Sequence, residues 1–310
     1  MSLSALPTEA AGKNDVCAVI VTFRPEIGML RKVVTSVKDQ VEQLLIFDNG
    51  TDAPELSAYL SEVEVASTSV IRSPTNVGLA TAMNRAADYA RQNGFGYLLL
   101  LDQDSQPHSV MVSTLKTALL ELNQTEPTAA VGPQFRDRRT GYIAPFVKVG
   151  FPISRKIAGG PGQRIKCDFL ISSGTLLPLS SLDRVGPMDE SLFIDNVDLE
   201  WCFRAQYRGM ALYGICDAQM QHSIGDAVRP SRLVSGGIKI HSPTRLYYIM
   251  RNRVLLYGRK ETPIIWIAQD IPRLLLKFIG TIIFLSPRLQ YLRSMTAGLH
   301  DAWTQKTGPR

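Results

Sequence analysis

Two carboxylates, Asp102 and Asp104, follow directly on the apolar segment of residues 97–101. Such an uninterrupted apolar segment is typical of a parallel strand that is buried on both faces. Open α/β sheets bind ligands at the carboxyl ends of their strands, so we expect both carboxylates at that edge. Paired carboxylate oxygens suit a hard divalent cation, Mg²⁺ or Mn²⁺, that also holds phosphate oxygens. A solvated turn uses the same residue types, but the rest of the chain favours a metal–diphosphate site.

Strand-like and helix-like segments alternate through the first half of the chain. The predicted strands are residues 16–23, 43–47, 70–71, 97–101 and 129–131, and the predicted helices are residues 28–41, 56–62, 79–92 and 110–123. This alternation predicts an α/β fold with a mostly parallel sheet covered on both faces. Residues 136–166 are rich in glycine, proline and basic residues, and we expect a loop or a β-hairpin there.

Polar residues also end the other predicted strands. Thr22 ends the first strand and Asp48 the second, where a carboxylate can accept a hydrogen bond from a base or a ribose hydroxyl. Asn76 and Gly78 open the helix that begins at residue 79. A glycine there lets the backbone approach a ligand, and a helix N-terminus favours phosphate. The chain has no GxGxxG or P-loop motif, so a dinucleotide or ATP site is not indicated.

The charge of the chain is unevenly distributed. The net charge is +6, but residues 229–310 carry 14 Lys or Arg residues against three acidic ones. A basic C-terminal third indicates an anionic partner, which could be nucleic acid, a phosphorylated substrate or an acidic membrane leaflet. Residues 1–14 carry no apolar or basic run and are expected to be disordered, without a targeting signal. The four widely spaced cysteines are expected to be reduced core residues.

The C-terminal segment has its own pattern. Residues 264–267 and 278–285 are strongly apolar, but charged residues between them interrupt the roughly 20 apolar residues that a spanning helix needs. Apolar residues interleaved with Arg, Lys and Trp fit amphipathic helices that lie in a membrane interface. Residues 259–310 are therefore predicted to be a membrane-associating helical tail. A helix pair that closes the back of the domain is the alternative.

Taken in order along the chain, these residues resemble family 2 glycosyltransferases of the GT-A fold. The set consists of Thr22, Asp48-Asn49, Asn76-Val77-Gly78 and Asp102-Gln103-Asp104. Later segments resemble the bacterial rhamnosyltransferase branch, namely residues 169–174 and 193–201, Arg204, His222 and residues 241–252. The resemblance implies a GT-A domain over residues 15–258, with a nucleotide-binding half (15–133) and an acceptor half (134–258).

The resemblance also implies roles for individual residues. Asp104 would ligate Mg²⁺ or Mn²⁺ at the diphosphate of the sugar nucleotide, and Asp102 would hold the donor and support the metal. His222 would complete the metal shell or contact the diphosphate, although a lone histidine can equally be structural. Ser173 would lie beneath the donor sugar, and Arg251 would bind phosphate through its bidentate guanidinium.

Inverting sugar transfer needs a base that takes the proton of the acceptor hydroxyl. On a helix, Asp195 and Asp198 would share a face, whereas Glu200 would point elsewhere. Many relatives carry Glu-Asp where this chain has Asp195-Asn196, and an asparagine cannot serve as the base. Asp195 is therefore the expected base and Asp198 the second candidate. The alternative is a first helical turn whose acids complement the helix dipole.

The resemblance implies metal-dependent transfer of L-rhamnose, or a similar deoxysugar, from a dTDP-sugar to a lipid-linked or lipopolysaccharide (O-antigen) glycan. The protein would lie peripherally on the cytoplasmic face of the cell membrane and bind no nucleic acid. A rhamnolipid-type acceptor is the near alternative. A non-catalytic protein that binds nucleotides or anionic lipids would explain the basic tail. It would not explain the converging carboxylates, which repel phosphate unless a metal intervenes.

Overall fold

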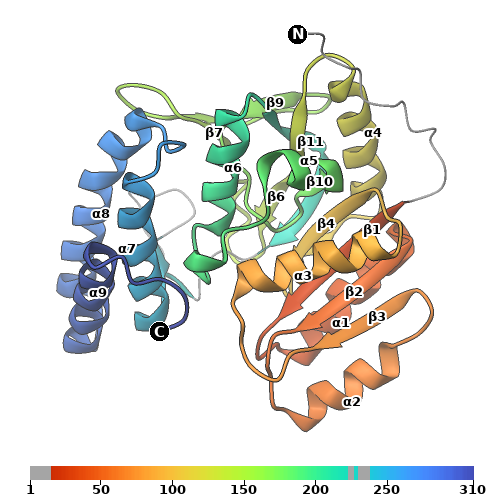
Figure 1. The fold of residues 1–310 in the computed structure, drawn as a ribbon, viewed down its shortest axis with the longest axis horizontal. Helices are drawn as coiled ribbons and strands as arrows, with labels where there is room; N and C mark the ends of the chain where they lie inside the picture. The colour runs from red at the N-terminus through yellow and green to blue at the C-terminus, as the bar shows by residue number, and fades with distance from the viewer. Residues whose placement is uncertain (1–14, 223–226, 230–237) are drawn as a thin grey trace.

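The computed structural model describes residues 15–222, 227–229 and 238–310, so the predicted disordered N-terminus, residues 1–14, lies outside the described residues. Nine strands of the described part form one sheet in the order β3-β2-β1-β4-β10-β6-β11-β5, with β9 paired to β11 (Figure 1). The parallel strands are β1 (Val16–Thr22), β2 (Gln43–Asp48), β3 (Thr68–Arg72), β4 (Tyr97–Asp102), β6 (Thr128–Asp137) and β11 (Ala211–His222). The antiparallel strands are β5 (Gln106–Pro107), β9 (Arg164–Cys167) and β10 (Leu176–Pro178). This mixed, mostly parallel sheet confirms the predicted α/β fold.

Helices cover both faces of the sheet because successive side chains of each strand point to opposite sides. Val19, Phe47 and Leu100 are buried on the face covered by α3 (Leu79–Gln92), α5 (Leu179–Val185) and α6 (Val197–Tyr207). Ile20, Ile46 and Leu101 are buried on the face covered by α1 (Ile27–Val37), α2 (Pro54–Val63) and α4 (Met111–Asn123). The short helices η1 (Lys38–Gln40) and η2 (Glu190–Leu192) precede β2 and α6. The central strands therefore read as continuous apolar runs in the sequence.

The strand registers place polar residues at one edge of the sheet. Thr22 pairs with Asp48 across β1 and β2, and Val21 pairs with Asp102 across β1 and β4, so the three strands end almost level. Beyond β6, the predicted loop or hairpin is a hairpin of β7 (Phe146–Lys148) and β8 (Arg155–Ile157). A further antiparallel pair is formed by β12 (Ala227–Arg229) and β13 (Ile238–Ile240).

Three C-terminal helices form a layer beside the sheet, namely α7 (Pro243–Tyr257), α8 (Ile264–Phe284) and α9 (Arg288–Trp303) (Figure 1). A Cβ atom on Gly298 of α9 would lie 2.4 Å from the carbonyl oxygen of Tyr247, so the glycine allows α9 to approach α7 closely. The Tyr247 hydroxyl donates to Asp301 at 2.7 Å. The sequence predicted a domain boundary between residues 258 and 259. In the structure, α7 before this boundary packs tightly against α9 after it.

The predicted tail is thus folded onto α7 by its inner faces, while α8 keeps an exposed apolar face. Within the described part of the chain, no helix is both long enough and apolar enough to cross a bilayer. The exposed apolar residues of α8 recur mostly at helical spacing, which places them along one side. They are Ile264, Ile265, Ile271, Leu275, Leu276, Ile279 and Ile283, with Phe284 at the end of the helix.

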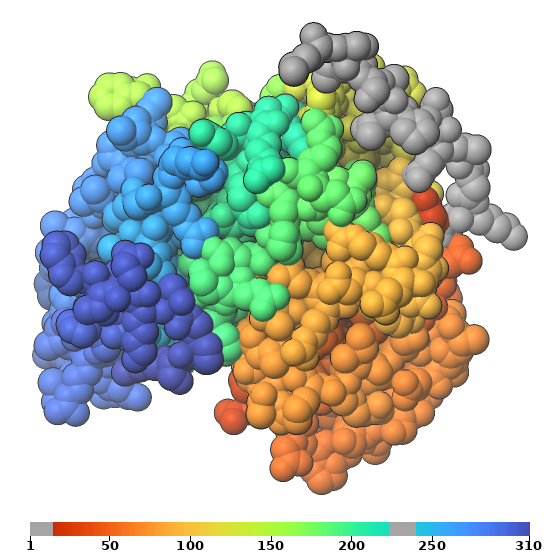
Figure 2. Space-filling view, viewed as in Figure 1, coloured from red at the N-terminus to blue at the C-terminus, as the bar shows by residue number. Residues whose placement is uncertain are grey.

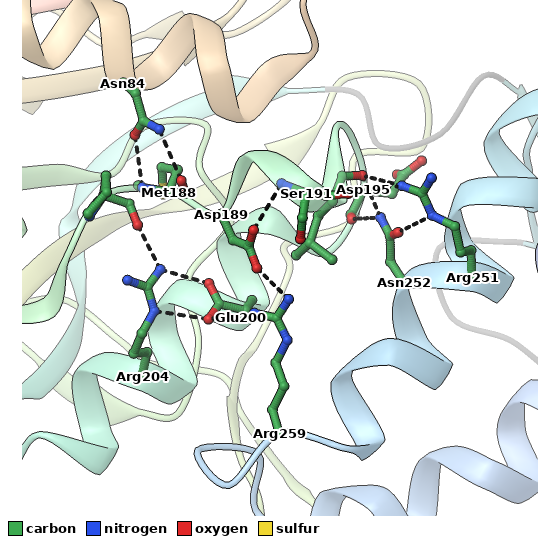
Figure 3. Close-up of polar contacts among 12 residues, drawn as sticks. Asn84, Met188, Asp189, Ser191, Asp195, Glu200, Arg204, Arg251, Asn252 and Arg259 are labelled. Atoms are coloured by element: carbon green, nitrogen blue, oxygen red, sulfur yellow. Dashed lines mark hydrogen bonds and ion pairs between the residues drawn. The ribbon is translucent and has the colours of Figure 1, made fainter. Parts of the chain in front are cut away.

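Two buried side chains of α7 join this layer to the segment before α6. The amide nitrogen of Asn252 lies within 2.7–2.9 Å of the carbonyl oxygens of Leu192, Ile194 and Asp195 (Figure 3). The neighbouring Arg251 guanidinium donates to the carbonyls of Ser191 and Leu192 at 3.3 and 3.0 Å. Buried carbonyl groups need such partners, so α7 fixes the backbone of residues 191–195.

We expect Asn252→Ala to lower the free energy of unfolding by about 3 kcal/mol, because buried carbonyls would lose their donor. Urea denaturation measures this change. Asn93→Ala is the matched control, since Asn93 is exposed and its amide donates to one carbonyl, that of Tyr89. The control should cost less than about 1 kcal/mol. Equal small losses in both variants would contradict a fixing role for Asn252.

Candidate active site

A cavity of about 520 Å³ opens at the carboxyl edge of β1 and β4, and we call it the edge cavity. Its lining residues come from strand ends, from the segment before α6 and from α7. They include Asn49, Asn76, Gly78, Asp102, Gln103, Asp104, Ser172, Phe193, Asp195, Asn196, Asp198, His222 and Arg245. The structure thus brings together both predicted catalytic acids and all three predicted metal ligands.

Asp102, Asp104 and His222 form a compact group on the sheet side of this cavity. Each offers one ligand atom, and these atoms all lie within 4.8 Å of one another. His222 Nδ1 is 3.3 Å from Asp104, and Nε2 is 3.8 Å from Asp102. His222 reaches the group because it ends the 12-residue strand β11, whose last residues pair with β5 directly after the Asp104 turn.

The His222 ring is buried, and side chains of the protein interior contact it on the side away from the edge cavity. Ser105 Oγ lies 3.1 Å from His222 Nδ1 and also contacts Ser173 Oγ, while Phe135 packs edge-on against the ring. Ser173 itself is buried and does not line the edge cavity. It therefore supports His222 from the protein interior, rather than lying directly beneath a sugar as predicted.

The chemistry of this group fits a hard divalent cation. Two carboxylates and an imidazole converge, and oxygen-rich sets of this kind suit Mg²⁺ or Mn²⁺. Burial raises the pKa of the Asp102 carboxyl, and Asp104 adds to the rise while His222 opposes it. When bound there, the cation would stabilise the negative charge of a diphosphate leaving group.

Asp195 also lines the edge cavity, but it is not on a helix as predicted. Its φ is +61°, Asn196 has φ +63°, and α6 begins only at Val197. Such left-handed conformations are costly for residues other than glycine, and the hydrogen bonds from α7 hold them in place. Arg245 of α7 binds the Asp195 carboxylate through two nitrogens, at 2.6 and 3.3 Å.

Asp198 stands in the first turn of α6. Its two carboxylate oxygens accept hydrogen bonds from the backbone N–H groups of Leu199 at 2.8 Å and Ser172 at 3.2 Å. Burial raises the pKa of Asp198 to about 6, and the nearby carboxylates of Asp102 and Asp195 add to the rise. A carboxylate with this pKa can accept a proton efficiently near neutral pH.

Glu200 has a structural environment, in line with the expectation that it points away from the other acids. Its carboxylate is buried and pairs with Arg204 at 2.8 and 2.9 Å and with Arg259 at 3.1 Å (Figure 3). Arg259 also pairs with Asp189. These ion pairs tie α6 and the preceding segment to the C-terminal layer.

The structure requires a glycine at position 78 for a different reason from the one predicted. Its φ is +89°, and a Cβ atom there would lie 2.5 Å from the ring of Phe193. The first N–H groups of α3, from Leu79 and Ala80, donate to the Phe193 carbonyl at 2.7 and 3.4 Å. The predicted use of this helix N-terminus for phosphate is therefore wrong, because a protein carbonyl occupies it. Gly78 and Asn76 still line the edge cavity.

Three more predicted nucleotide-binding residues lie outside the lining of the edge cavity. Thr22 is buried and its hydroxyl donates to the Phe47 carbonyl, and the Asp48 carboxylate accepts from Thr51 N–H. Arg251 is fully buried and directs its donors to Asn252 and to backbone carbonyls. A phosphate could not reach this guanidinium, so the sequence-based role of Arg251 is replaced by a structural one.

The sequence contained only weak indications that some other residues would line the cavity. Arg245 was one of several basic residues in its stretch, and only the fold selects it as the partner of Asp195. Gln103 stands between the two aspartates, and its side chain accepts a hydrogen bond from Phe23 N–H at 2.8 Å, which ties β1 to the Asp102 turn. Phe193 stacks on Tyr248 of α7, with ring centroids 5.2 Å apart.

Comparison with known proteins gives consistent matches. A family model described as Glycosyl transferase family 2 matches residues 18–175. The chain is 30% identical over 297 residues to the dTDP-rhamnosyl transferase RfbF of Shigella flexneri, covering 95% of this chain and 97% of that protein. The structure of GalNAc-T7 with UDP, GalNAc and Mn²⁺ has a TM-score of 0.58 at 13% identity, covering 94% of this chain and 57% of that chain. TarS 1–349 of S. aureus in complex with UDP-GlcNAc has a TM-score of 0.54 at 12% identity, covering 94% and 88%.

The sheet topology and the likeness to these solved structures show the GT-A fold, which confirms the fold predicted by resemblance. The chain belongs to glycosyl transferase family 2 and is a glycosyltransferase. Its similarity to a rhamnosyl transferase over almost its full length also confirms the resemblance to that branch.

We expect Asp104→Ala to weaken Mn²⁺ binding at least tenfold, because the cation would lose a charged ligand. Titration of the protein with Mn²⁺ alone, followed by electron paramagnetic resonance, measures the affinity. Asp88→Ala is the control, since Asp88 is an exposed acid on α3 paired with Arg91. Unchanged affinity in Asp104→Ala would place the cation elsewhere.

Proposed function

We propose that the protein is an inverting, metal-dependent rhamnosyltransferase that moves L-rhamnose from dTDP-rhamnose to a lipid-linked or lipopolysaccharide O-antigen glycan. The observation that carries this proposal is the 30% identity to a dTDP-rhamnosyl transferase over 95% of the chain. An alignment of that length includes both sides of the edge cavity. The Asp102, Asp104 and His222 group supports it, because it would hold the cation at the donor diphosphate.

A panel of sugar nucleotides tests the donor. With Mg²⁺ or Mn²⁺ present, we expect the protein to hydrolyse dTDP-rhamnose slowly without acceptor, and UDP-GlcNAc at least tenfold more slowly still. The cation should be required for both. Faster turnover of a UDP-sugar than of dTDP-rhamnose would contradict the proposed donor while leaving the glycosyltransferase class intact.

We propose Asp198 as the catalytic base. A second cavity of about 490 Å³, which we call the outer cavity, shares Asn196 and Asp198 with the edge cavity. The base must contact the acceptor hydroxyl where that oxygen approaches the donor, and Asp198 is the carboxylate where the two cavities meet. The acceptor oxygen would attack the anomeric carbon, the bond to dTDP would break, and the hydroxyl proton would pass to Asp198.

Asp195, the base favoured from the sequence, is supported less well by the geometry. Its carboxylate lines the edge cavity but not the outer cavity, and it is paired with the Arg245 guanidinium. We propose that Asp195 positions Arg245 and the donor. Asp195 is the alternative base, because its carboxylate also lines the edge cavity.

We expect Asp198→Asn to lower kcat about 10²–10⁴-fold, with dTDP affinity kept within a factor of about two. Since Asp198 must be ionised to accept the proton, wild-type kcat should fall as the pH drops below about 6, and this acidic limb should vanish in the variant. Asp195→Asn is the comparison. It should raise the KM for the donor and keep the acidic limb of the pH profile. Loss of the limb in Asp195→Asn alone would assign the base to Asp195.

We also propose that the exposed face of α8 holds the protein at the cytoplasmic membrane surface. The face is apolar and lies within the basic C-terminal third, so apolar burial and attraction to anionic lipids would act together. Truncation would not test this cleanly, because α9 covers buried residues of α7.

Surface variants give a cleaner test of membrane association. We expect Leu275→Ser/Leu276→Ser to reduce binding to anionic phospholipid vesicles roughly tenfold, since two exposed leucines would no longer be buried in lipid. Val65→Ser/Val110→Ser removes exposed apolar residues far from α8 and should not matter. Vesicle sedimentation at low salt measures binding. Wild-type protein that stays in solution would end the membrane hypothesis.

A further inference from the structure

The outer cavity lies between the β7–β8 hairpin and α8, and it ends at Asn196 and Asp198, where the edge cavity begins. In the space-filling view, the yellow-green atoms around the hairpin lie beside the blue atoms of the C-terminal helices (Figure 2). Its volume is in the range of sites for small organic ligands. The sequence pattern assigned the tail to the membrane, with a helix pair that closes the back of the domain as the alternative, and did not indicate this cavity.

A polar bridge holds the two walls together. The Gln269 side chain of α8 donates to the carbonyl of Gly150, and it accepts from Ser154 Oγ at 2.7 Å and from Arg273 Nη2 at 3.0 Å. Gly150 and Ser154 both lie in the loop between β7 and β8. These hydrogen bonds join the loop of the hairpin to α8.

The outer cavity is lined by three cations, Lys156, Arg253 and Arg273, and by two acids, Asp198 and Asp270. Lys156 of β8 and Arg273 of α8 line it from opposite walls, and neither forms an ion pair with a carboxylate of the described residues. The third cation, Arg253, is neutralised by the buried carboxylate of Asp270 at 2.5 Å. Two cations that face one cavity without acidic partners favour a ligand carrying phosphate.

Two further nitrogens in the lining residues are unsatisfied. Asn196 Nδ2 and Arg253 Nε are buried and have no hydrogen-bond partner among the described residues. Buried donors are rarely left without acceptors, so such atoms commonly mark a site that a ligand or water completes. Both residues line the outer cavity, and Asn196 lies where it meets the edge cavity.

The outer cavity also has an apolar side. Trp266 of α8 lines it, is 5% exposed and packs against Phe203, so it forms part of an apolar wall. Ile153, in the hairpin loop, lines the cavity and is 71% exposed, and Phe151 in the same loop is 81% exposed. An apolar chain leaving the cavity would find these two side chains at its mouth.

Building on the proposed rhamnosyl transfer, we propose that the outer cavity is the acceptor site for a glycan carried on a lipid phosphate or diphosphate. Lys156 and Arg273 bind the phosphate, the sugar lies toward Trp266 and Asp198, and the lipid leaves over Ile153 and Phe151. The acceptor hydroxyl thereby reaches Asp198 from the side opposite the donor. Lys156 and Arg273 act as binding residues and play no part in donor chemistry.

Farnesyl diphosphate is the probe that tests this site, measured by titration calorimetry on the full chain. EDTA in the buffer prevents diphosphate from binding through a cation at the edge cavity. We expect wild-type protein to bind farnesyl diphosphate at least tenfold more tightly than farnesol or inorganic pyrophosphate. Lys156→Gln/Arg273→Gln should weaken this binding at least tenfold, and Lys260→Gln/Arg293→Gln, which removes the same charge from exposed sites elsewhere, should not.

Binding of dTDP with Mn²⁺ separates this inference from the proposed function. The Lys156→Gln/Arg273→Gln variant should keep wild-type dTDP affinity and dTDP-rhamnose hydrolysis while the KM for a lipid-linked acceptor rises. Unchanged farnesyl diphosphate affinity in that variant would overturn the acceptor site alone. Equal affinity for pyrophosphate would overturn the lipid part of the proposal. A wild-type protein that binds neither dTDP nor farnesyl diphosphate would contradict the proposed function as well.

Discussion

The backbone of residues 191–195 depends on two buried side chains of α7, and this backbone supplies part of the lining of the edge cavity. Asn252 and Arg251 bind its carbonyl groups and so hold Phe193, Asp195 and the start of α6 in place. The positive φ angles of the segment would be unfavourable without this support. The C-terminal layer is therefore part of the catalytic architecture, and its outer surface is left for other contacts.

Electrostatics explains why this arrangement suits a diphosphate donor. Asp102, Asp104, Asp195 and Asp198 converge on one cavity, where Arg245 pairs with Asp195. A diphosphate would be repelled from the remaining carboxylates unless a divalent cation lay between them. The side of the cavity away from the metal group leads to the cationic outer cavity, so each anionic group of donor and acceptor would have its own positive partner.

The sequence predicted most of the first half of the chain because its strands are buried on both faces and its ligands stand at strand ends. Asp102 and Asp104 follow such a strand, and the structure places them as expected. The roles of Asp195 and Arg251 were harder to predict from the sequence. The left-handed backbone at Asp195 breaks the helical periodicity, and an arginine that binds carbonyl groups looks the same in sequence as one that binds phosphate. Long-range contacts, such as the bridge from Gln269 to the β7–β8 loop, leave no local pattern.

Diffraction from crystals grown with Mn²⁺ and dTDP, recorded above the manganese absorption edge, tests the central claim most directly. We expect one anomalous peak within coordination distance of Asp102, Asp104 and His222, with the dTDP diphosphate on its cavity side and Asp198 beyond it. A manganese peak away from these three residues, or dTDP bound outside the edge cavity, would contradict the account.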